Sequence, residues 1–134
     1  MVLRRFFLIL VSLTAALLAA NLAAEKSTRP LRSPATVKGF VGGESHDSYA
    51  IHAREGHEMI VHISWEPEHD KELGDNHAEF FVSEFPQFAG EGVRFGNKSD
   101  EGKTWSGRVP KTRSYYIYVM AHPTAHYILK VTVK

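Results

Sequence analysis

Residues 115–119 of this chain read YYIYV, and residues 127–133 read YILKVTV. In both segments the side chains alternate between two faces with a period of two, and β-branched and aromatic residues predominate. This pattern is typical of half-buried β-strands. The intervening residues 120–126 have the length of a hairpin connection, and Pro123 disfavours a helix there. The sequence therefore predicts an antiparallel hairpin over residues 115–133.

The preceding part of the chain contains further segments of the same kind. Residues 48–53 and 58–65 alternate in the same way and are separated by a tight turn, in which Gly56 can supply a positive φ, so they predict a second hairpin. No segment shows a convincing helical period. Several short strands with regular turn signals predict an all-β fold, an antiparallel β-sandwich. Additional strands are expected at residues 35–40, 77–85 and 104–109.

The apolar faces of the C-terminal segments predict the core between the two sheets. Tyr116 and Tyr118 fall on the opposite face. They are explained equally well as a recognition surface or as residues packed beneath the long connection 86–102. The residues expected to be buried together are Trp105, Tyr115, Ile117, Val119, Leu129 and Val131.

The N-terminus has the organisation of a secretory signal peptide. Arg4 and Arg5 precede an apolar run over residues 6–18, and small residues follow up to Ala24. The apolar run is short for a membrane span of about 20 residues. We therefore expect residues 1–24 to be removed and the mature protein to be periplasmic or secreted.

The remaining chain is expected to form one domain. Residues 25–34 are polar, contain Pro30 and Pro34, and predict a flexible arm ahead of a single domain over residues 35–134. Removal of residues 1–24 changes the formal charge from +1 to −1, because it removes two arginines and no acids. A nearly neutral domain has no electrostatic footprint for nucleic acid. The chain has no cysteine, so its apolar core must hold the fold without disulfides.

The sequence favours binding over catalysis. It has no nucleotide-binding loop, no cysteine nucleophile and no Gly-x-Ser-x-Gly nucleophile elbow. Histidine, aspartate and glutamate gather in the loop 66–77, but zinc sites usually show closely spaced ligand pairs on a rigid element. We therefore interpret this loop as solvated and predict no metal site and no cofactor. If metal did bind there, His69 and His77 would be the first candidates, with Asp70 or Asp75.

The order of these features resembles the bacterial pre-peptidase C-terminal domain, a jelly-roll-like β-sandwich. The resemblance rests on a glycine turn, the alternating segments 47–53 and 56–63, the segment 105–110 (WSGRVP) and the two closing strands. A solitary exported domain of this pattern is similar to the periplasmic inhibitors of g-type lysozyme. The resemblance implies a non-enzymatic protein that blocks the substrate cleft of a lysozyme with loops at one end of the sandwich. The alternative is a secreted carbohydrate- or matrix-binding module of the same fold.

Candidate partner-binding residues follow from this resemblance. A lysozyme cleft carries a catalytic carboxylic acid, so a blocking loop needs hydrogen-bond donors. The alternation leaves open whether the turn 42–47 and the connection 121–125 lie at the same end, and the resemblance implies that they do. The donors in these two loops are Ser45, His46, His122 and Thr124, and Arg108 and Arg113, flanking another turn, are the reserve candidates.

Overall fold

The computed structural model describes residues 27–134, and the predicted signal peptide lies outside these residues. Eleven strands and one short 3₁₀ turn, η1 (Asp100–Gly102), make up the described part. No helix in residues 27–134 is long and apolar enough to cross a membrane. The strands are β1 (Arg29–Leu31), β2 (Ala35–Gly42), β3 (Asp47–Ala53), β4 (Glu58–Trp65), β5 (His69–Asp70), β6 (Gly74–Asp75), β7 (His77–Ser83), β8 (Asn97–Ser99), β9 (Thr104–Arg108), β10 (Arg113–His122) and β11 (Thr124–Val133).

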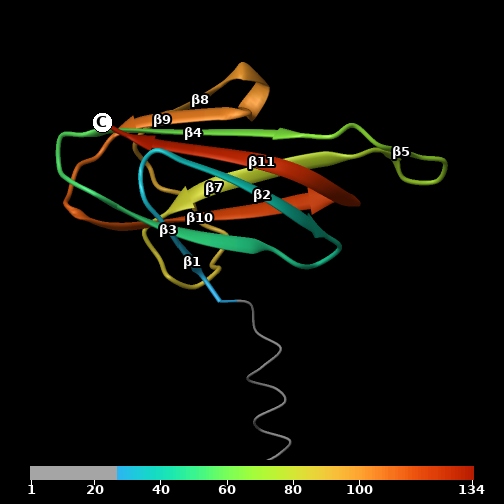
Figure 1. Ribbon diagram of the computed structural model, residues 1–134, viewed down its shortest axis with the longest axis horizontal. Coiled ribbons are helices and arrows are strands. Elements are labelled where there is room, and N and C mark those ends of the chain that lie inside the picture. The colour runs from blue at the N-terminus through green and yellow to red at the C-terminus, as the bar shows by residue number, and fades with distance from the viewer. Residues whose placement is uncertain (1–26) are drawn as a thin grey trace, which may run out of the picture.

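Two sheets pack face to face, which confirms the predicted β-sandwich (Figure 1). The four-stranded sheet has the order β1-β3-β10-β7, and the five-stranded sheet has the order β2-β11-β4-β9-β8. The small hairpin β5-β6 projects from one end. All pairings are antiparallel except that of β1 with β3.

Both predicted hairpins were wrong, although all four of their strands are present. β10 pairs with β3 and β7, whereas β11 pairs with β2 and β4, so the connection between β10 and β11 crosses from one sheet to the other. The turn between β3 and β4 crosses in the same way. Alternation shows that a strand has one buried face, but two strands that face each other across a core satisfy it as well as two hydrogen-bonded neighbours.

The core prediction is confirmed. The inward faces of β3, β4, β10 and β11 meet between the sheets, and every one of the six predicted core residues is at most 5% exposed. Trp105 lies at the margin of this core, where Phe95 packs edge-on against its ring at 5.6 Å. Tyr115 is fully buried, and its hydroxyl donates to the carbonyl oxygen of Lys111. Desolvation raises the pKa of Tyr115 above its usual value.

The second face of β10 is covered by the long connection that follows β7. Tyr118 is buried, contacts the rings of Phe81 and Phe88, and donates a hydrogen bond of 2.6 Å to the carbonyl oxygen of Phe85. Of the two explanations left open for this tyrosine, packing beneath the loop is therefore the one observed. Tyr116 is only half-buried.

The structure differs from the expected flexible arm. Residues Arg29–Leu31 form β1, which adds to the edge of the four-stranded sheet in parallel with β3. The Ser33 hydroxyl accepts a hydrogen bond from the Val133 amide at 2.7 Å. The prolines suggested an unstructured segment, but Pro30 lies on an edge strand, where its missing N–H is tolerated.

Replacement of Val131 by alanine tests the position of the core. Val131 is fully buried on β11 between β2 and β4. We expect Val131→Ala to lower the free energy of unfolding by ~1–3 kcal/mol, because apolar burial is lost and a cavity remains. Chemical denaturation measures this loss, with Thr132→Ala on the outer face of the same strand as control. A loss below about 0.5 kcal/mol would place Val131 outside the core.

Candidate functional site

Three connections meet at one end of the sandwich, which we call the rim. The rim comprises residues 43–46 between β2 and β3, residues 122–124 between β10 and β11, and residues 66–76, which carry the β5-β6 hairpin. Gly43 N–H donates to the carbonyl oxygen of Pro123 at 2.9 Å, and the Asn76 amide donates to that of Thr124 at 3.2 Å. These bonds place all three segments together, beyond the ends of β2 and β10 and at the end from which β5 projects (Figure 1).

The close approach of the first two segments depends on glycine. A Cβ atom at Gly42 would lie 2.3 Å from the Thr124 side chain and 2.6 Å from the carbonyl oxygen of Pro123. The next residue, Gly43, has a φ of +64°, a conformation that other residues adopt only with strain. The Ser45 hydroxyl donates to the Gly42 carbonyl oxygen at 2.6 Å and closes the turn.

A buried tyrosine connects the two sheets directly behind the rim. Tyr127, on β11, donates a hydrogen bond of 2.6 Å to the Asp47 carboxylate at the start of β3, and its hydroxyl also meets that of Tyr49. Burial, followed by its hydrogen bonds to Asp47 and Tyr49, raises the pKa of Tyr127 far above its usual value. The ring lies against Gly39, where a Cβ would come within 2.4 Å of it.

The segment 66–76 is an ordered finger. Asn76 is buried at its base, where its side chain accepts from the Glu68 amide at 2.8 Å and donates to the Glu66 carbonyl oxygen at 2.9 Å. At the tip the Asp70 carboxylate accepts from the amides of Leu73 and Glu72, and these bonds lower the pKa of Asp70. The expected solvated loop is therefore exposed to solvent but has a defined conformation.

The histidine of this finger and the one that follows it each make a contact with a single side chain. His69 Nδ1 lies 2.8 Å from the Asp75 carboxylate, and both side chains are exposed. His77 instead lies edge-on to the indole of Trp65, at 5.1 Å between ring centroids. Within residues 27–134 no group of three or more potential ligands is arranged to hold a metal ion.

The predicted partner-binding residues divide between the two ends of the sandwich. Ser45, His46, His122 and Thr124 belong to the rim, with His122 exposed and Thr124 half-buried. His46 is not free, because its ring stacks on Phe88 at 4.2 Å.

The two reserve arginines lie at the opposite end. Arg108 is exposed and donates weakly to the Gly56 carbonyl oxygen at 3.4 Å. Arg113 donates to the Glu84 carbonyl oxygen at 2.7 Å and forms an ion pair with the Glu84 carboxylate at 3.6 Å. Arg113 therefore has a structural role, and Arg108 is the freer cation.

Sequence reasoning missed two residues of the rim. His77, next to the finger, is the register partner of His122 on the neighbouring strand, and both side chains are exposed, so two histidines occupy paired backbone positions at this end. Asn76 ties the finger to Thr124. A buried asparagine between polar neighbours carries no sequence signal, whereas the pairing of β7 with β10 would have revealed His77.

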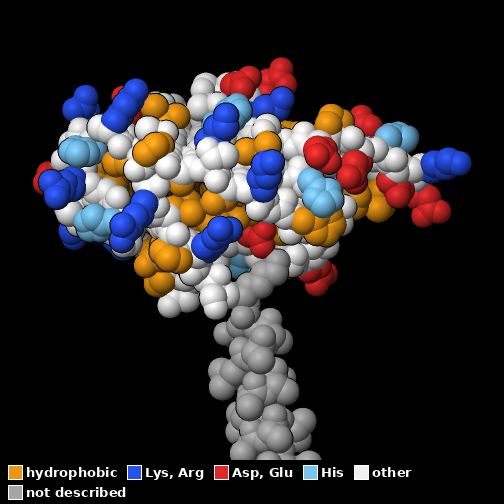
Figure 2. All heavy atoms as spheres, viewed as in Figure 1, with side chains coloured by type: hydrophobic (Ala, Val, Ile, Leu, Met, Phe, Trp, Pro, Cys, Tyr) orange, Lys and Arg blue, Asp and Glu red, His pale blue; other side chains and the backbone are white. Residues whose placement is uncertain are grey.

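Charge is distributed unequally between the two ends. Figure 2 shows acidic side chains gathered over the end that carries the finger and basic side chains over the opposite end. The exposed acids of the rim are Glu44, Glu66, Glu68, Asp70, Glu72 and Asp75. The exposed cations of the opposite end are Arg32, Arg54, Arg108, Lys111 and Lys134. The rim thus combines a negative finger with the hydrogen-bond donors of the two neighbouring loops.

Comparisons with known proteins identify the fold. No protein-family model and no curated protein sequence matches the chain. Among solved structures, Aeromonas hydrophila PliG, a periplasmic lysozyme inhibitor of g-type lysozyme, matches with a TM-score of 0.62 and 21% identity over 81% of this chain and 96% of that chain. The pre-peptidase C-terminal domain of collagenase from Bacillus anthracis matches with a TM-score of 0.55 and 17% identity over 81% of this chain and 97% of that domain. Salmonella Typhimurium PliG, also a periplasmic lysozyme inhibitor of g-type lysozyme, matches with a TM-score of 0.52 and 17% identity over 81% of this chain and 100% of that chain. The chain therefore has the β-sandwich fold shared by these domains, as the resemblance predicted.

Substitution of Asn76 tests the anchoring of the finger. We expect Asn76→Ala to cost ~1–3 kcal/mol, because backbone groups of Glu66, Glu68 and Thr124 lose their partner. Asn76→Asp is the matched variant, since it keeps the acceptor for the Glu68 amide but loses both donors. Denaturation measures the cost, and amide hydrogen exchange should rise in residues 66–76 in both variants. Unchanged exchange in that segment would contradict the anchoring role.

Proposed function

We propose that this protein is an exported, non-enzymatic lysozyme inhibitor that places its rim in the substrate cleft of a g-type lysozyme. The observation that carries the proposal is the joining of the two predicted loops at one end of a fold shared with periplasmic inhibitors of g-type lysozyme. The predicted signal peptide supports action in the periplasm or outside the cell.

The rim supplies donors for the catalytic carboxylic acid of such a cleft. His122 is exposed at the end of β10, and His77 stands beside it on β7. A protonated imidazole donates from both nitrogens and binds a carboxylate better than a neutral one. The Thr124 hydroxyl lies two residues further along, at the start of β11. We assign His122 the contact with the acid, with His77 and Thr124 adjacent.

The acidic finger would contact the partner beside the cleft. Its carboxylates would repel a catalytic acid, so the finger fits the wall of a cleft better than the floor. The Asn76 bonds hold it in one conformation before binding, which lowers the conformational entropy lost on association. Leu73, 68% exposed near the tip, offers an apolar contact.

Two single substitutions at opposite ends test the proposal. His122→Ala should weaken inhibition at least about tenfold, because truncation of a central contact commonly costs ~2 kcal/mol. Arg108→Ala, an exposed cation removed from the other end, should change inhibition less than about twofold. Both should leave the melting temperature nearly unchanged, since both side chains are exposed. The measurement is the inhibition constant against a g-type lysozyme acting on a peptidoglycan suspension.

Two outcomes would contradict the proposal. Loss of inhibition in Arg108→Ala together with normal inhibition in His122→Ala would assign binding to the opposite end. A wild-type protein that inhibits neither g-type, chicken-type nor invertebrate-type lysozyme would exclude the inhibitor function itself. In that case the binding-module alternative would take its place.

A further inference from the structure

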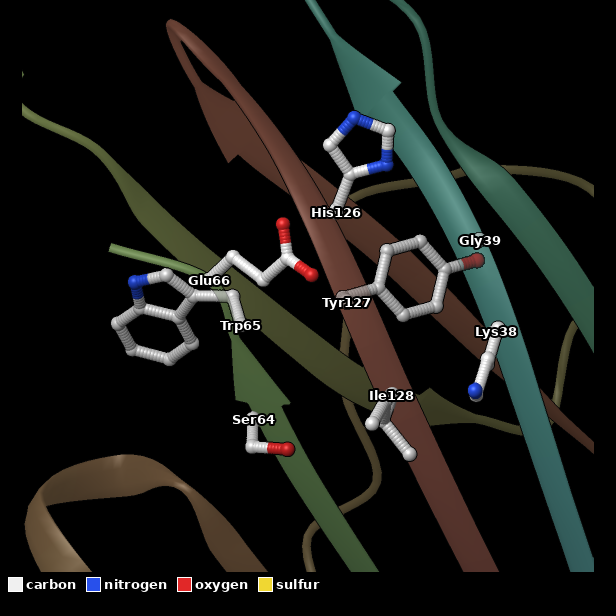
Figure 3. Close-up of a pocket in the computed structure, with 8 residues that line it drawn as sticks. All are labelled: Lys38, Gly39, Ser64, Trp65, Glu66, His126, Tyr127 and Ile128. Carbon is white, nitrogen blue, oxygen red and sulfur yellow. The ribbon is translucent and has the colours of Figure 1, made fainter. Parts of the chain in front are cut away.

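A shallow groove on the outer face of the five-stranded sheet is separate from the donors of the rim. It spans β2, β11 and β4 and has a volume of about 270 Å³ (Figure 3). This volume lies just below the range of about 300–1,000 Å³ typical of small-molecule sites. Its lining combines exposed or half-exposed side chains of the outer face with two residues that contribute to the core, Tyr127 and the partly buried Trp65.

The strand register arranges six outward side chains in two adjacent rows. In the first row His126 on β11 lies between Phe40 on β2 and Glu66, the residue that follows β4. The backbone N–H of Glu66 donates a hydrogen bond to the His126 carbonyl oxygen. In the second row Ile128 stands between Lys38 and Ser64. Each row therefore combines an apolar surface with groups that donate or accept hydrogen bonds.

The polar members of these rows are available to a ligand. Lys38, Ser64, Glu66 and His126 have no side-chain hydrogen bond or ion pair with the rest of residues 27–134. By contrast, His62 on the same sheet has a partner within the protein, because its Nδ1 atom forms a hydrogen bond of 2.8 Å with the Thr104 hydroxyl. Four unused polar groups around one hollow indicate a polar ligand with several hydroxyl or amide groups.

An aromatic ring lies beside the groove, next to His126 of its lining. Phe40 is 53% exposed, although it lies within a regular strand, and its ring is held at 4.5 Å from the His126 ring. Such a fixed and half-exposed aromatic side chain offers a large contact area at a low entropic cost. Lys38 contributes a positive charge and Glu66 a negative charge, so the lining favours a ligand without net charge.

We propose that this groove binds a neutral oligosaccharide, with about one or two sugar rings stacked beside Phe40 and hydrogen-bonded to Lys38, Ser64 and Glu66. Sugar rings combine apolar C–H faces with equatorial hydroxyl groups, which is the chemistry that the two rows present. Of the six outward side chains only Glu66, at the base of the finger, also belongs to the rim, and none of the six is a proposed contact with the catalytic acid.

Titration of the full chain with soluble oligosaccharides tests the proposal. Cellotetraose and the N-acetylglucosamine tetramer are the probes, and two-dimensional amide NMR is the measurement. We expect saturable shifts in the amides of Lys38, Ser64, His126 and Ile128 with at least one of the two. Phe40→Ala should weaken this binding at least about tenfold without changing the melting temperature. The matched control is Phe88→Ala, which removes a 44% exposed phenylalanine elsewhere and should leave binding unchanged.

The outcomes distinguish this site from the proposed function. His122→Ala should bind the oligosaccharide as the wild type does, and Phe40→Ala should inhibit lysozyme as the wild type does. The absence of saturable shifts with both probes would overturn the glycan site, as would equal losses in Phe40→Ala and Phe88→Ala. Binding confined to an anionic polysaccharide such as heparin would overturn the assignment of a neutral ligand.

Discussion

The buried hydroxyl of Tyr127 joins the two sheets at the point where the rim begins. It donates to Asp47 at the first residue of β3, while its own strand starts only three residues earlier, at Thr124. Exclusion from water strengthens this hydrogen bond relative to one at an exposed site. The position of Asp47 relative to β11 fixes the turn 43–46 against residues 122–124. Gly42 then allows the two loops to approach closely, and Asn76 attaches the finger to residue Thr124.

The rim and the groove both follow from the path of β11 between β2 and β4. Its inward residues Tyr127, Leu129 and Val131 fill the core, whereas His126 and Ile128 face outward beside β2 and β4. Its first residue, Thr124, approaches Gly42 so closely that no side chain fits there, and its carbonyl oxygen anchors the finger through Asn76. One strand thus contributes to the core and to both surfaces, and each role uses different residues.

The sequence was sufficient to predict the longer strands, the buried residues and the fold, because these depend on side-chain alternation within single segments. The short strands β1, β5, β6 and β8 were not predicted. Trp105 and Val131 are buried as expected, and Tyr118 fits one of its two explanations. Strand partners were not predictable, because alternation is identical for a neighbour within a sheet and a neighbour across the core. For the same reason the pairing of His77 with His122 on neighbouring strands was not predicted. The order of the finger was also missed, because it depends on the buried contacts of Asn76, whose sequence neighbours are mostly polar and exposed.

Hydrogen exchange of the full chain with and without an excess of g-type lysozyme tests the central claim most directly, because it maps the bound surface without any substitution. The account predicts that lysozyme slows amide exchange in residues 42–46, 66–77 and 121–125, and leaves exchange in residues 54–57 and 109–113 unchanged. Slower exchange confined to residues 54–57 and 109–113 would contradict the account, because it would place the lysozyme at the basic end of the sandwich.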